Sequence, residues 1–476
     1  RKNTIGYNTT FESPYGKKPL IYADWLASGR LYEPIEKKIQ QDFGPFVANT
    51  HTETSETGVR MTKSYHNAQH IIKEHVNAGP NDVIINAGSG MTTVINKLQR
   101  IMGLKGCGML KNKDCLREAE KPVVFVTHME HHSNHTSWLE TIADVVLLEP
   151  DNEMLVDPKD LENKLEDYKD RKFKLGSFSA CSNVTGIRTP YHQLAKIMHK
   201  YGGLAFVDFA ASAPYVDINM HPEDPEEKLD AIFFSPHKFL GGPGSAGIMV
   251  FDKRLYHTPV PDNPGGGTVD WTNRWGEYKF VDDIEAREDG GTPGFLQVIK
   301  AALAIKLKEQ MGTENIEARE KELVQLAFQE LRNIPGIKIL ADNVEDRLGV
   351  ISFYHEDIHF NLLVKLLNDR YGIQVRGGCA CAGTYGHYLL NVTYKNSKHI
   401  TDLINHGDLS QKPGWARWSL HPTMTDEEVY YFTNALKEII ENVEQWEKEY
   451  TYDKHMNEFI HKKAEPFNVN QWFTME

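Results

Sequence analysis

The sequence lacks any uninterrupted apolar run of about 18 residues, the length that a membrane-spanning helix needs. Its opening residues, RKNTIGYNTTFE, also lack the apolar core of a secretory signal peptide. Basic side chains are outnumbered, with 53 Lys and Arg against 66 Asp and Glu, which gives a net charge of −13. Because such a surface repels a phosphate backbone, we expect neither a membrane protein nor a general nucleic-acid binder.

Cysteine is also scarce, since the chain has only five, an odd number, in 476 residues. They are Cys107, Cys115, Cys181, Cys379 and Cys381. Small secreted domains that depend on disulfides carry a denser set of cysteines, usually in even numbers. The sequence therefore predicts a protein without a disulfide framework, in a reducing, cytoplasmic setting.

The composition that remains, 40% hydrophobic and 25% charged, is that of a globular protein, and the length predicts two domains. Short apolar runs alternate with helical patterns such as 92–102 and 191–201. The runs that we expect to be strands are 82–88, 122–128, 144–150, 175–181, 204–210, 230–235 and 247–251. Because most of them are continuously apolar, they predict an α/β domain whose mostly parallel sheet is covered by helices on both faces.

Two segments rich in glycine and proline, 263–268 and 288–294, interrupt this alternation. An amphipathic pattern then predicts one long helix over 295–333, with a break near Gly312. The remaining expected elements are strands at 349–355 and 372–378 and helices at 359–370 and 426–446. The predicted divisions are an N-terminal arm (1–20), a large domain (21–294) and a smaller C-terminal α+β domain (295–476).

A lysine in an unusual setting follows the expected strand at 230–235. Lys238 lies in the segment SPHKFLGGPGSAG, whose glycines allow the backbone to approach a ligand closely. The ends of strands are also where open α/β sheets bind ligands. An isolated lysine is more often an exposed loop residue. The preceding Ser235, Pro236 and His237 instead favour a lysine that forms a Schiff base with a cofactor.

Asp208 comes at the end of the expected strand 204–210, where an unpaired carboxylate would be costly. A helix cap or an ion pair would satisfy this carboxylate. The protonated pyridine nitrogen of pyridoxal 5′-phosphate (PLP) would satisfy it too, and that pairing makes the ring an electron sink. The 30 residues from Asp208 to Lys238 leave room for one helix and one strand, so two neighbouring strands can present both groups to one ring.

The turn NAGSGMTT (86–93) joins the first of these strands to a helix. Its backbone N–H groups and the hydroxyls of Thr92 and Thr93 can hold a phosphate at a helix N-terminus. A dinucleotide-binding turn is the alternative, but the third glycine of that fingerprint is absent and no P-loop lysine follows.

Four histidines, His128, His131, His132 and His135, crowd the segment THMEHHSNHTSW. A zinc site would need three or four convergent ligands, which one short loop does not readily supply. We therefore expect no metal, and we predict that one of these histidines stacks on the ring of the cofactor.

The segment RGGCACAGTYGH (376–387) carries Arg376, Cys379 and Cys381 among several glycines. A loop cysteine is often only a small hydrophobic residue. The functional alternative is a thiol nucleophile on a loop that glycines keep flexible. Arg376 offers a planar fork that suits the carboxylate of a substrate, although a surface ion pair is its commoner role.

In this order along the chain, these motifs resemble those of the class V aminotransferase family of PLP-dependent enzymes, most closely its cysteine desulfurase and selenocysteine lyase branch. The resemblance extends over roughly residues 20–445. It implies the aspartate aminotransferase-like fold, with a large seven-stranded PLP domain and a smaller C-terminal domain. It also implies a homodimer with shared active sites.

Each motif then implies a role. Lys238 forms the Schiff base, Asp208 pairs with the pyridine nitrogen, His131 stacks on the ring and Asn183 lies near the phenolic oxygen. The phosphate is held by Ser235, His237, Thr92 and the backbone of Gly90 and Met91, with Thr292 reaching the phosphate in the partner subunit. Arg376 holds the α-carboxylate of the substrate. The catalytic residues are Lys238, His131 and the nucleophile Cys381.

The chain departs from the pattern of the family at three places. Ala211 stands where a glutamine usually contacts the phenolic oxygen, and Met91 stands where threonine is usual. The cysteine loop has two cysteines, and residues 388–415 form an insertion beside it. These departures bear on the substrate more than on the cofactor.

The leading functional hypothesis is the conversion of L-cysteine to L-alanine, with a persulfide left on Cys381 for a possible sulfur-acceptor protein. The alternative is a related lyase, epimerase or aminotransferase that uses Lys238 without the cysteine. A regulatory protein that keeps the fold without catalysis is a third hypothesis, which the presence of Lys238, Asp208 and His131 disfavours.

Overall fold

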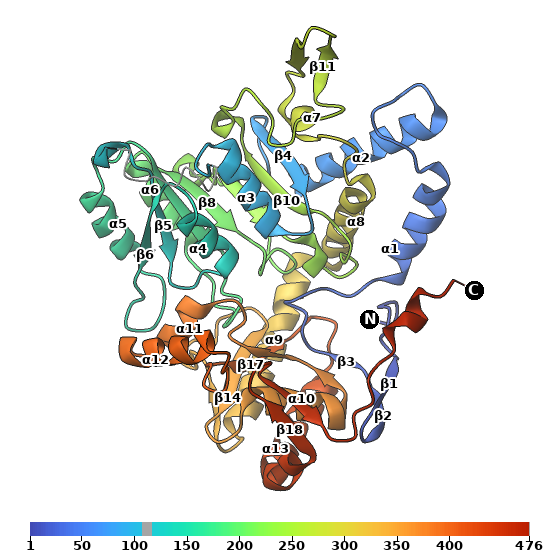
Figure 1. Cartoon of the computed structure of the whole chain (residues 1–476), viewed down its shortest axis with the longest axis vertical. Coiled ribbons are helices and arrows are strands. Elements are labelled where there is room, and N and C mark those ends of the chain that lie inside the picture. The colour runs from blue at the N-terminus through green and yellow to red at the C-terminus, as the bar shows by residue number, and fades with distance from the viewer. Residues whose placement is uncertain (107–116, 476) are drawn as a thin grey trace.

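A computed structural model describes residues 1–106 and 117–475, so Cys107 and Cys115 lie outside the described residues. Two β-sheets organise the molecule, a seven-stranded one in the upper half of Figure 1 and a four-stranded one in the lower half. Within the described part of the chain, no helix is long and apolar enough to cross a membrane. The described cysteines, Cys181, Cys379 and Cys381, are free thiols.

The seven-stranded sheet has the order β4-β10-β9-β8-β7-β5-β6. Its strands are β4 (Asp82–Ala87), β5 (Val123–Thr127), β6 (Asp144–Leu148), β7 (Lys174–Ser179), β8 (Leu204–Asp208), β9 (Ala231–Phe234) and β10 (Gly247–Asp252). Only β10 runs antiparallel to its neighbours, and the other pairs are parallel. The seven strands and the mostly parallel sheet predicted from the sequence are confirmed.

Alternate residues of these strands pack on opposite faces of the sheet, because side chains in a strand alternate in direction. Val207 and Ile232 belong to a core that α2 (Glu56–His75) and α8 (Phe295–Met311) cover. Phe206 and Phe233 face the other core. That second core is covered by α3 (Met91–Ile101) and α4 (His132–Leu139). Burial on both faces explains why these strands are continuously apolar.

The four-stranded sheet is antiparallel, in the order β13-β14-β17-β16. It consists of β13 (Ile337–Ile339), β14 (Val350–His355), β16 (Arg376–Gly378) and β17 (Trp415–Ser419). Its core is shared with α9 (Thr313–Arg332), α10 (Phe360–Tyr371) and α13 (Asp426–Trp446). Ala23 and Trp25, from far earlier in the chain, pack in the same core.

The strand predicted over 372–378 is two strands instead, so that prediction is wrong. β15 (Ile373–Gln374) pairs in parallel with β3 (Ile21–Tyr22), whereas β16 pairs with β17. The chain changes partners at Val375, because the N-terminal segment occupies the edge that a continuous strand would need. No local pattern in the sequence announces a partner more than 350 residues away.

The remaining elements lie around these two sheets. They are β1 (Thr10–Ser13), β2 (Gly16–Pro19), α1 (Glu33–Lys38), α5 (Pro158–Asp167), α6 (Tyr191–Lys200), β11 (Val269–Thr272), β12 (Tyr278–Phe280), α7 (Ile284–Glu288), α11 (Gly383–Leu389), α12 (Tyr394–Asn405), β18 (Tyr450–Asp453) and β19 (Glu458–His461). The hairpin β11–β12 projects at the top of Figure 1. The insertion predicted at 388–415 contains α12, and the domain divisions proposed from the sequence stay a prediction.

The helix predicted over 295–333 is confirmed with its break, since α8 ends and α9 begins on either side of Gly312. Gly312 has φ +80°, a conformation that is unfavourable for any residue with a Cβ atom.

We expect Gly312→Ala to lower the free energy of unfolding by roughly 1–3 kcal/mol, measured by urea denaturation. Gly266→Ala is the control, because no heavy atom lies within 4 Å of its added Cβ. Equal effects of the two substitutions would contradict this account.

Candidate active site

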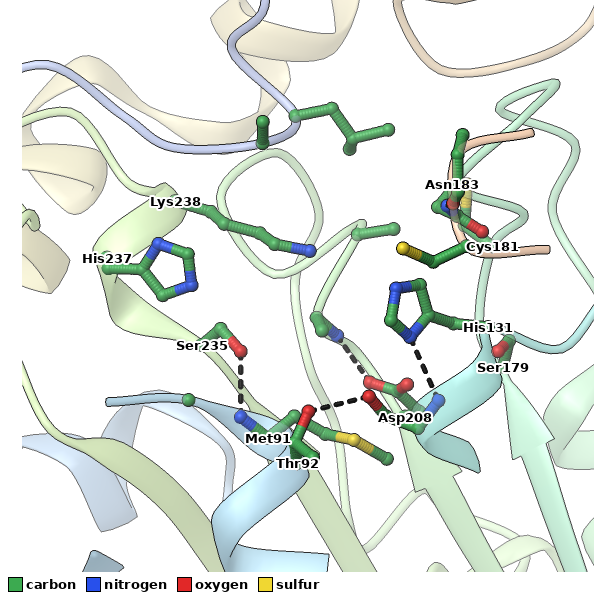
Figure 2. Close-up of a pocket in the computed structure, with 18 of the residues that line it drawn as sticks. Met91, Thr92, His131, Ser179, Cys181, Asn183, Asp208, Ser235, His237 and Lys238 are labelled. Atoms are coloured by element: carbon green, nitrogen blue, oxygen red, sulfur yellow. Dashed lines mark hydrogen bonds between the residues drawn. The ribbon is translucent and has the colours of Figure 1, made fainter. Parts of the chain in front are cut away.

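The predicted site residues come together at the carboxyl ends of the strands of the large sheet, around one cavity of about 220 Å³. Those that line it are Gly90, Met91, Thr92, His131, Asn183, Asp208, Ser235, His237, Lys238, Arg376 and Cys381. Figure 2 shows the Lys238 amine and the His131 ring directed toward the same space, with the Asp208 carboxyl group below them in that view. Segments spread over nearly 300 residues thus meet at one sheet edge, as open α/β sheets favour.

One side of the cavity carries hydroxyl groups and a helix N-terminus, groups that can bind an anion. The helix α3 begins at Met91, whose backbone N–H donates to Ser235 Oγ at 2.9 Å. Thr92 Oγ1 lies 2.6 Å from Ser133 Oγ. A Cβ atom on Gly90 would lie 3.0 Å from Ser235 Oγ, so glycine allows the turn to approach that hydroxyl. Hydroxyls and N–H groups at a helix N-terminus suit a phosphate.

Asp208 is buried and Lys238 is partly exposed, and desolvation disfavours the charged form of each. Burial raises the pKa of Asp208 to about 6, although Ala210 N donates to its Oδ1 at 2.8 Å. Burial lowers the pKa of Lys238 to about 8. A lysine with such a pKa has a substantial neutral fraction near physiological pH, and the neutral amine is the nucleophile.

His131 caps the start of α4, and its Nδ1 accepts a hydrogen bond from Ser133 N at 3.1 Å. That bond fixes the ring so that it faces the cavity (Figure 2). Burial, with the nearby charge of Lys238, lowers the pKa of His131 to about 3. This shift favours the neutral ring, which can stack on an aromatic cofactor.

A buried carboxyl group, Glu130, supports this turn and was not foreseen from the sequence. Its oxygens accept from Thr127 Oγ1 at 2.7 Å, from Ser179 Oγ at 2.6 Å and from Asn134 Nδ2 at 2.7 Å. Burial raises its pKa to about 7. The sequence does not indicate this role, because Glu130 lies among four histidines and that pattern suggests metal binding instead.

The other three histidines point to different partners. His128 Nε2 lies 3.2 Å from Met154 O, His132 Nε2 accepts from Gly383 N at 3.0 Å, and His135 Nδ1 lies 3.3 Å from Thr384 Oγ1. Among the described residues, no group of three potential metal ligands converges. His132 and His135 thus both contact the cysteine loop, residues 376–387.

The cysteine loop closes the cavity from the smaller sheet. Cys381 and Arg376 line it, and Arg376 Nε donates to Asp24 Oδ2 at 3.2 Å. A second arginine, Arg417, also lines the cavity, is 4% exposed and donates to Asp24 Oδ1 at 2.8 Å. Sequence reasoning missed Arg417 and Asp24. The signal available for Arg417 was a charged residue within the apolar strand WARWS, where burial requires a partner.

Asn183 lies between the cavity and the cysteine loop. Its Nδ2 donates to Ala380 O at 2.6 Å, while its Oδ1 is buried without a protein partner. Ala211, which also lines the cavity, adds no polar group there. A buried polar atom without a partner is uncommon and fits a site that receives a polar ligand.

Thr292 does not line this cavity, and neither does Thr93, whose hydroxyl the sequence predicts as a phosphate ligand. Thr292 is exposed, and Asn49 Nδ2 donates to its hydroxyl at 3.2 Å. His51 Nε2 lies 2.6 Å from the neighbouring Gly291 O. The contact of Thr292 with the phosphate of a partner subunit therefore stays a prediction.

The raised pKa of Asp208 makes a prediction about stability. As the pH rises from about 4 to 6, the unfolded chain loses this proton first, so Asp208 increasingly favours unfolding. We expect Asp208→Asn, which keeps the acceptor for Ala210 N, to stabilise the cofactor-free protein at pH 8 by up to roughly 2–3 kcal/mol and to have little effect at pH 4.

Urea denaturation at the two pH values measures the difference. The exposed Asp170→Asn is the matched control and is expected to show no such pH dependence. An effect of Asp208→Asn that is the same at pH 4 and pH 8 would contradict the prediction.

Comparisons with known proteins agree with this arrangement. The family model for aminotransferase class-V matches residues 21–432. A relative named "Probable cysteine desulfurase" from Halalkalibacterium halodurans is 28% identical over 374 residues, which cover 76% of this chain and 84% of the relative. A protein of the same name from Staphylococcus aureus is 27% identical over 403 residues, covering 82% of this chain and 91% of its own.

A solved structure of a cysteine desulfurase from Thermococcus onnurineus shares the fold, with a TM-score of 0.71 at 23% identity over 89% of this chain and 95% of its own. The predicted fold class, an α/β PLP-dependent transferase fold, is therefore confirmed. Since the family model spans most of the chain, this protein belongs to the class V aminotransferase family of PLP-dependent enzymes.

Proposed function

We propose that this protein binds PLP through a Schiff base on Lys238 and uses it to remove sulfur from L-cysteine. The observation that carries the proposal is the convergence of an amine, a buried carboxyl group and a thiol around one cavity, those of Lys238, Asp208 and Cys381. The names of the relatives from Halalkalibacterium and Staphylococcus support the choice of reaction.

The cavity has the donors and acceptors that PLP needs. Ser235, His237, Gly90, Met91 and Thr92 line the side that suits a phosphate. On the opposite side, the partnerless Oδ1 of Asn183 can accept a hydrogen bond from a protonated phenolic oxygen, while Nδ2 keeps its bond to Ala380 O. Asp208 would hold a proton on the pyridine nitrogen and His131 would stack on the ring, roles that their positions at the cavity support.

When bound, PLP supplies an electron sink for carbanion chemistry at the substrate Cα. The residues of the chain then divide the remaining work. The Lys238 amine, whose pKa of about 8 leaves it partly neutral, takes the Cα proton. Asp208 keeps the pyridine nitrogen protonated.

The thiol completes the reaction. The Cys381 thiolate attacks the sulfur of the substrate, the carbon–sulfur bond breaks, and the sulfur remains on Cys381 as a persulfide while the carbon skeleton leaves as alanine. Arg376 is placed to bind the α-carboxylate, and Arg417 adds a second guanidinium to the same wall. Asp24 accepts a hydrogen bond from each arginine, which orients both groups.

A second reaction type, a lyase, epimerase or aminotransferase reaction that needs no thiol, is favoured by one observation. Ala211 leaves no polar side chain where family members usually carry glutamine, so the contact near the substrate differs here. In that case Lys238 and His131 would perform the chemistry alone. The exposed thiol of Cys381 at the cavity favours desulfuration over this alternative.

We further propose that the protein acts as a homodimer in the cytoplasm. Thr292 lies on an exposed loop, outside the cavity of its own chain, from which it can reach the site of a partner. The persulfide would pass to a sulfur acceptor, either a small thiol or a protein.

The cofactor is tested by absorption. Adding PLP to the purified protein is expected to produce the visible band of a Schiff base, which Lys238→Ala removes because its side chain has no amine. Lys17→Ala, an exposed lysine in β2, is the control and should keep the band. A protein that stays colourless with added PLP would overturn the assignment and favour a regulatory role.

The reaction is tested by measuring alanine and sulfide from L-cysteine in the presence of a reducing thiol. Cys381→Ser is expected to lower turnover by at least about a hundredfold, because loss of a nucleophile removes the covalent route. Cys379→Ser is the matched control and should stay within about threefold of the wild type. Unchanged turnover in Cys381→Ser, with the cofactor band intact, would favour the reaction without the thiol.

A further inference from the structure

The loop that carries Cys381 has an unusual backbone. Ala380 and Cys381 are consecutive residues with φ +50° and +57°, in the left-handed region that residues with a Cβ atom rarely occupy. Such conformations persist only where the surrounding structure determines them, and they concentrate at functional sites. The contacts that hold this loop therefore determine where the thiol lies.

Hydrogen bonds from two other segments hold the loop on both sides of the thiol. Asn183 Nδ2 donates to Ala380 O at 2.6 Å, from the turn that follows β7. The backbone N–H of His132 donates to Cys381 O at 2.8 Å. The ring of the same histidine accepts, through Nε2, from the backbone N–H of Gly383 at 3.0 Å. One residue thus contacts the loop both at Cys381 and two residues beyond it.

His132 is suited to this role by its position and its protonation state. It is the first residue of α4 and follows His131, so it is attached to the residue that faces the cavity. Burial lowers the pKa of His132, which favours the neutral ring that can accept at Nε2. Gly383 provides the room, since a Cβ atom there would lie 3.2 Å from Nε2.

We propose that His132 is a positioning residue that fixes Cys381 at the cavity by hydrogen bonding to the backbone of the cysteine loop. This inference rests on the proposed function, in which the Cys381 thiol reacts. His132 takes no part in the chemistry, because it does not line the cavity and its Nε2 accepts from the loop backbone. His131 faces the cavity and His132 contacts the loop that carries the thiol. Because these two residues are adjacent in the chain, a single peptide bond links the two contacts.

The neighbouring contacts of the cysteine loop contribute less to the position of Cys381. His135 contacts the loop only through the side chain of Thr384, at 3.3 Å, farther from the thiol. Cys379 lies on the opposite side of the strained pair, and its carbonyl accepts from Ala382 N at 3.1 Å within the loop itself. The anchoring of Cys381 from outside the loop therefore depends on His132 and Asn183.

The test compares His132→Leu, which removes the ring acceptor, with His132→Gln, which keeps an oxygen at similar reach. The first measurement is hydrogen exchange of the peptide spanning 379–386 in the cofactor-free protein. We expect the Gly383 amide to exchange at least about tenfold faster in His132→Leu, and near the wild-type rate in His132→Gln. Equal protection in all three proteins would overturn the proposal.

The second measurement is steady-state turnover of L-cysteine by the holoenzyme. Because small misplacement of a reacting group is costly, kcat is expected to fall about tenfold or more in His132→Leu, with KM within twofold and the cofactor band unchanged. His132→Gln should recover kcat to within about threefold. His70→Leu, an exposed histidine on α2, controls for the substitution itself and should match the wild type.

The outcomes separate this inference from the proposed function. If Cys381→Ser abolishes turnover while His132→Leu leaves kcat unchanged, the positioning role is wrong and desulfuration stands. If Cys381→Ser has no effect, the proposed function fails, and the exchange measurement alone then decides whether His132 holds the loop. A fall in kcat that His132→Gln does not recover would overturn the role of the Nε2 acceptor.

Discussion

The whole site depends on an ionisable pair, a buried carboxyl group and a partly exposed amine, that follows two adjacent parallel strands. β8 ends at Asp208, and the chain leaves β9 four residues before Lys238, so the register of this strand pair brings the amine and the carboxyl group to one cavity. Desolvation raises the pKa of Asp208 and lowers the pKa of Lys238, so it favours the neutral form of each group. The lowered pKa leaves part of the amine neutral and therefore able to act as a nucleophile. The raised pKa means that the ionised carboxylate is unfavourable until a cationic group binds beside it.

The large sheet supplies this pair, but it does not close the cavity. The closing wall comes from the smaller sheet, and the N-terminal segment contacts both sides. Gly29 N donates to His237 O, beside Lys238, at 2.9 Å. Ala23 N donates to Gln374 O, and Ser419 N donates to Ala23 O, both at 2.9 Å. Asp24, the next residue, accepts hydrogen bonds from two arginines of that wall. The orientation of both arginines, one of which we propose to bind the substrate, is therefore coupled to a segment near the start of the chain.

The thiol shows a different balance of forces. Its loop adopts a conformation that its sequence alone disfavours, at two consecutive residues, and contacts from α4 and from the turn after β7 compensate. The glycines in RGGCACAG suggested a flexible loop. The structure instead shows that Gly383 makes room for the His132 ring, so this glycine serves close packing.

The sequence by itself determined the seven strands, the helix break at Gly312 and the residues that face the cavity from the ends of those strands. Strand burial on both faces leaves a continuous apolar signature, and a charged residue at its end marks the sheet edge. These signals are local, so they can be read without the fold.

Only the tertiary structure decided the rest. Pairing of β15 with β3, the arginine pair at Asp24 and the bonds from His132 to the cysteine loop all join residues that are far apart in the chain. The sequence grouped four histidines together, yet their side chains point to separate partners. The physical reason is that a side chain's role depends on its direction and partners, which packing sets and sequence proximity does not.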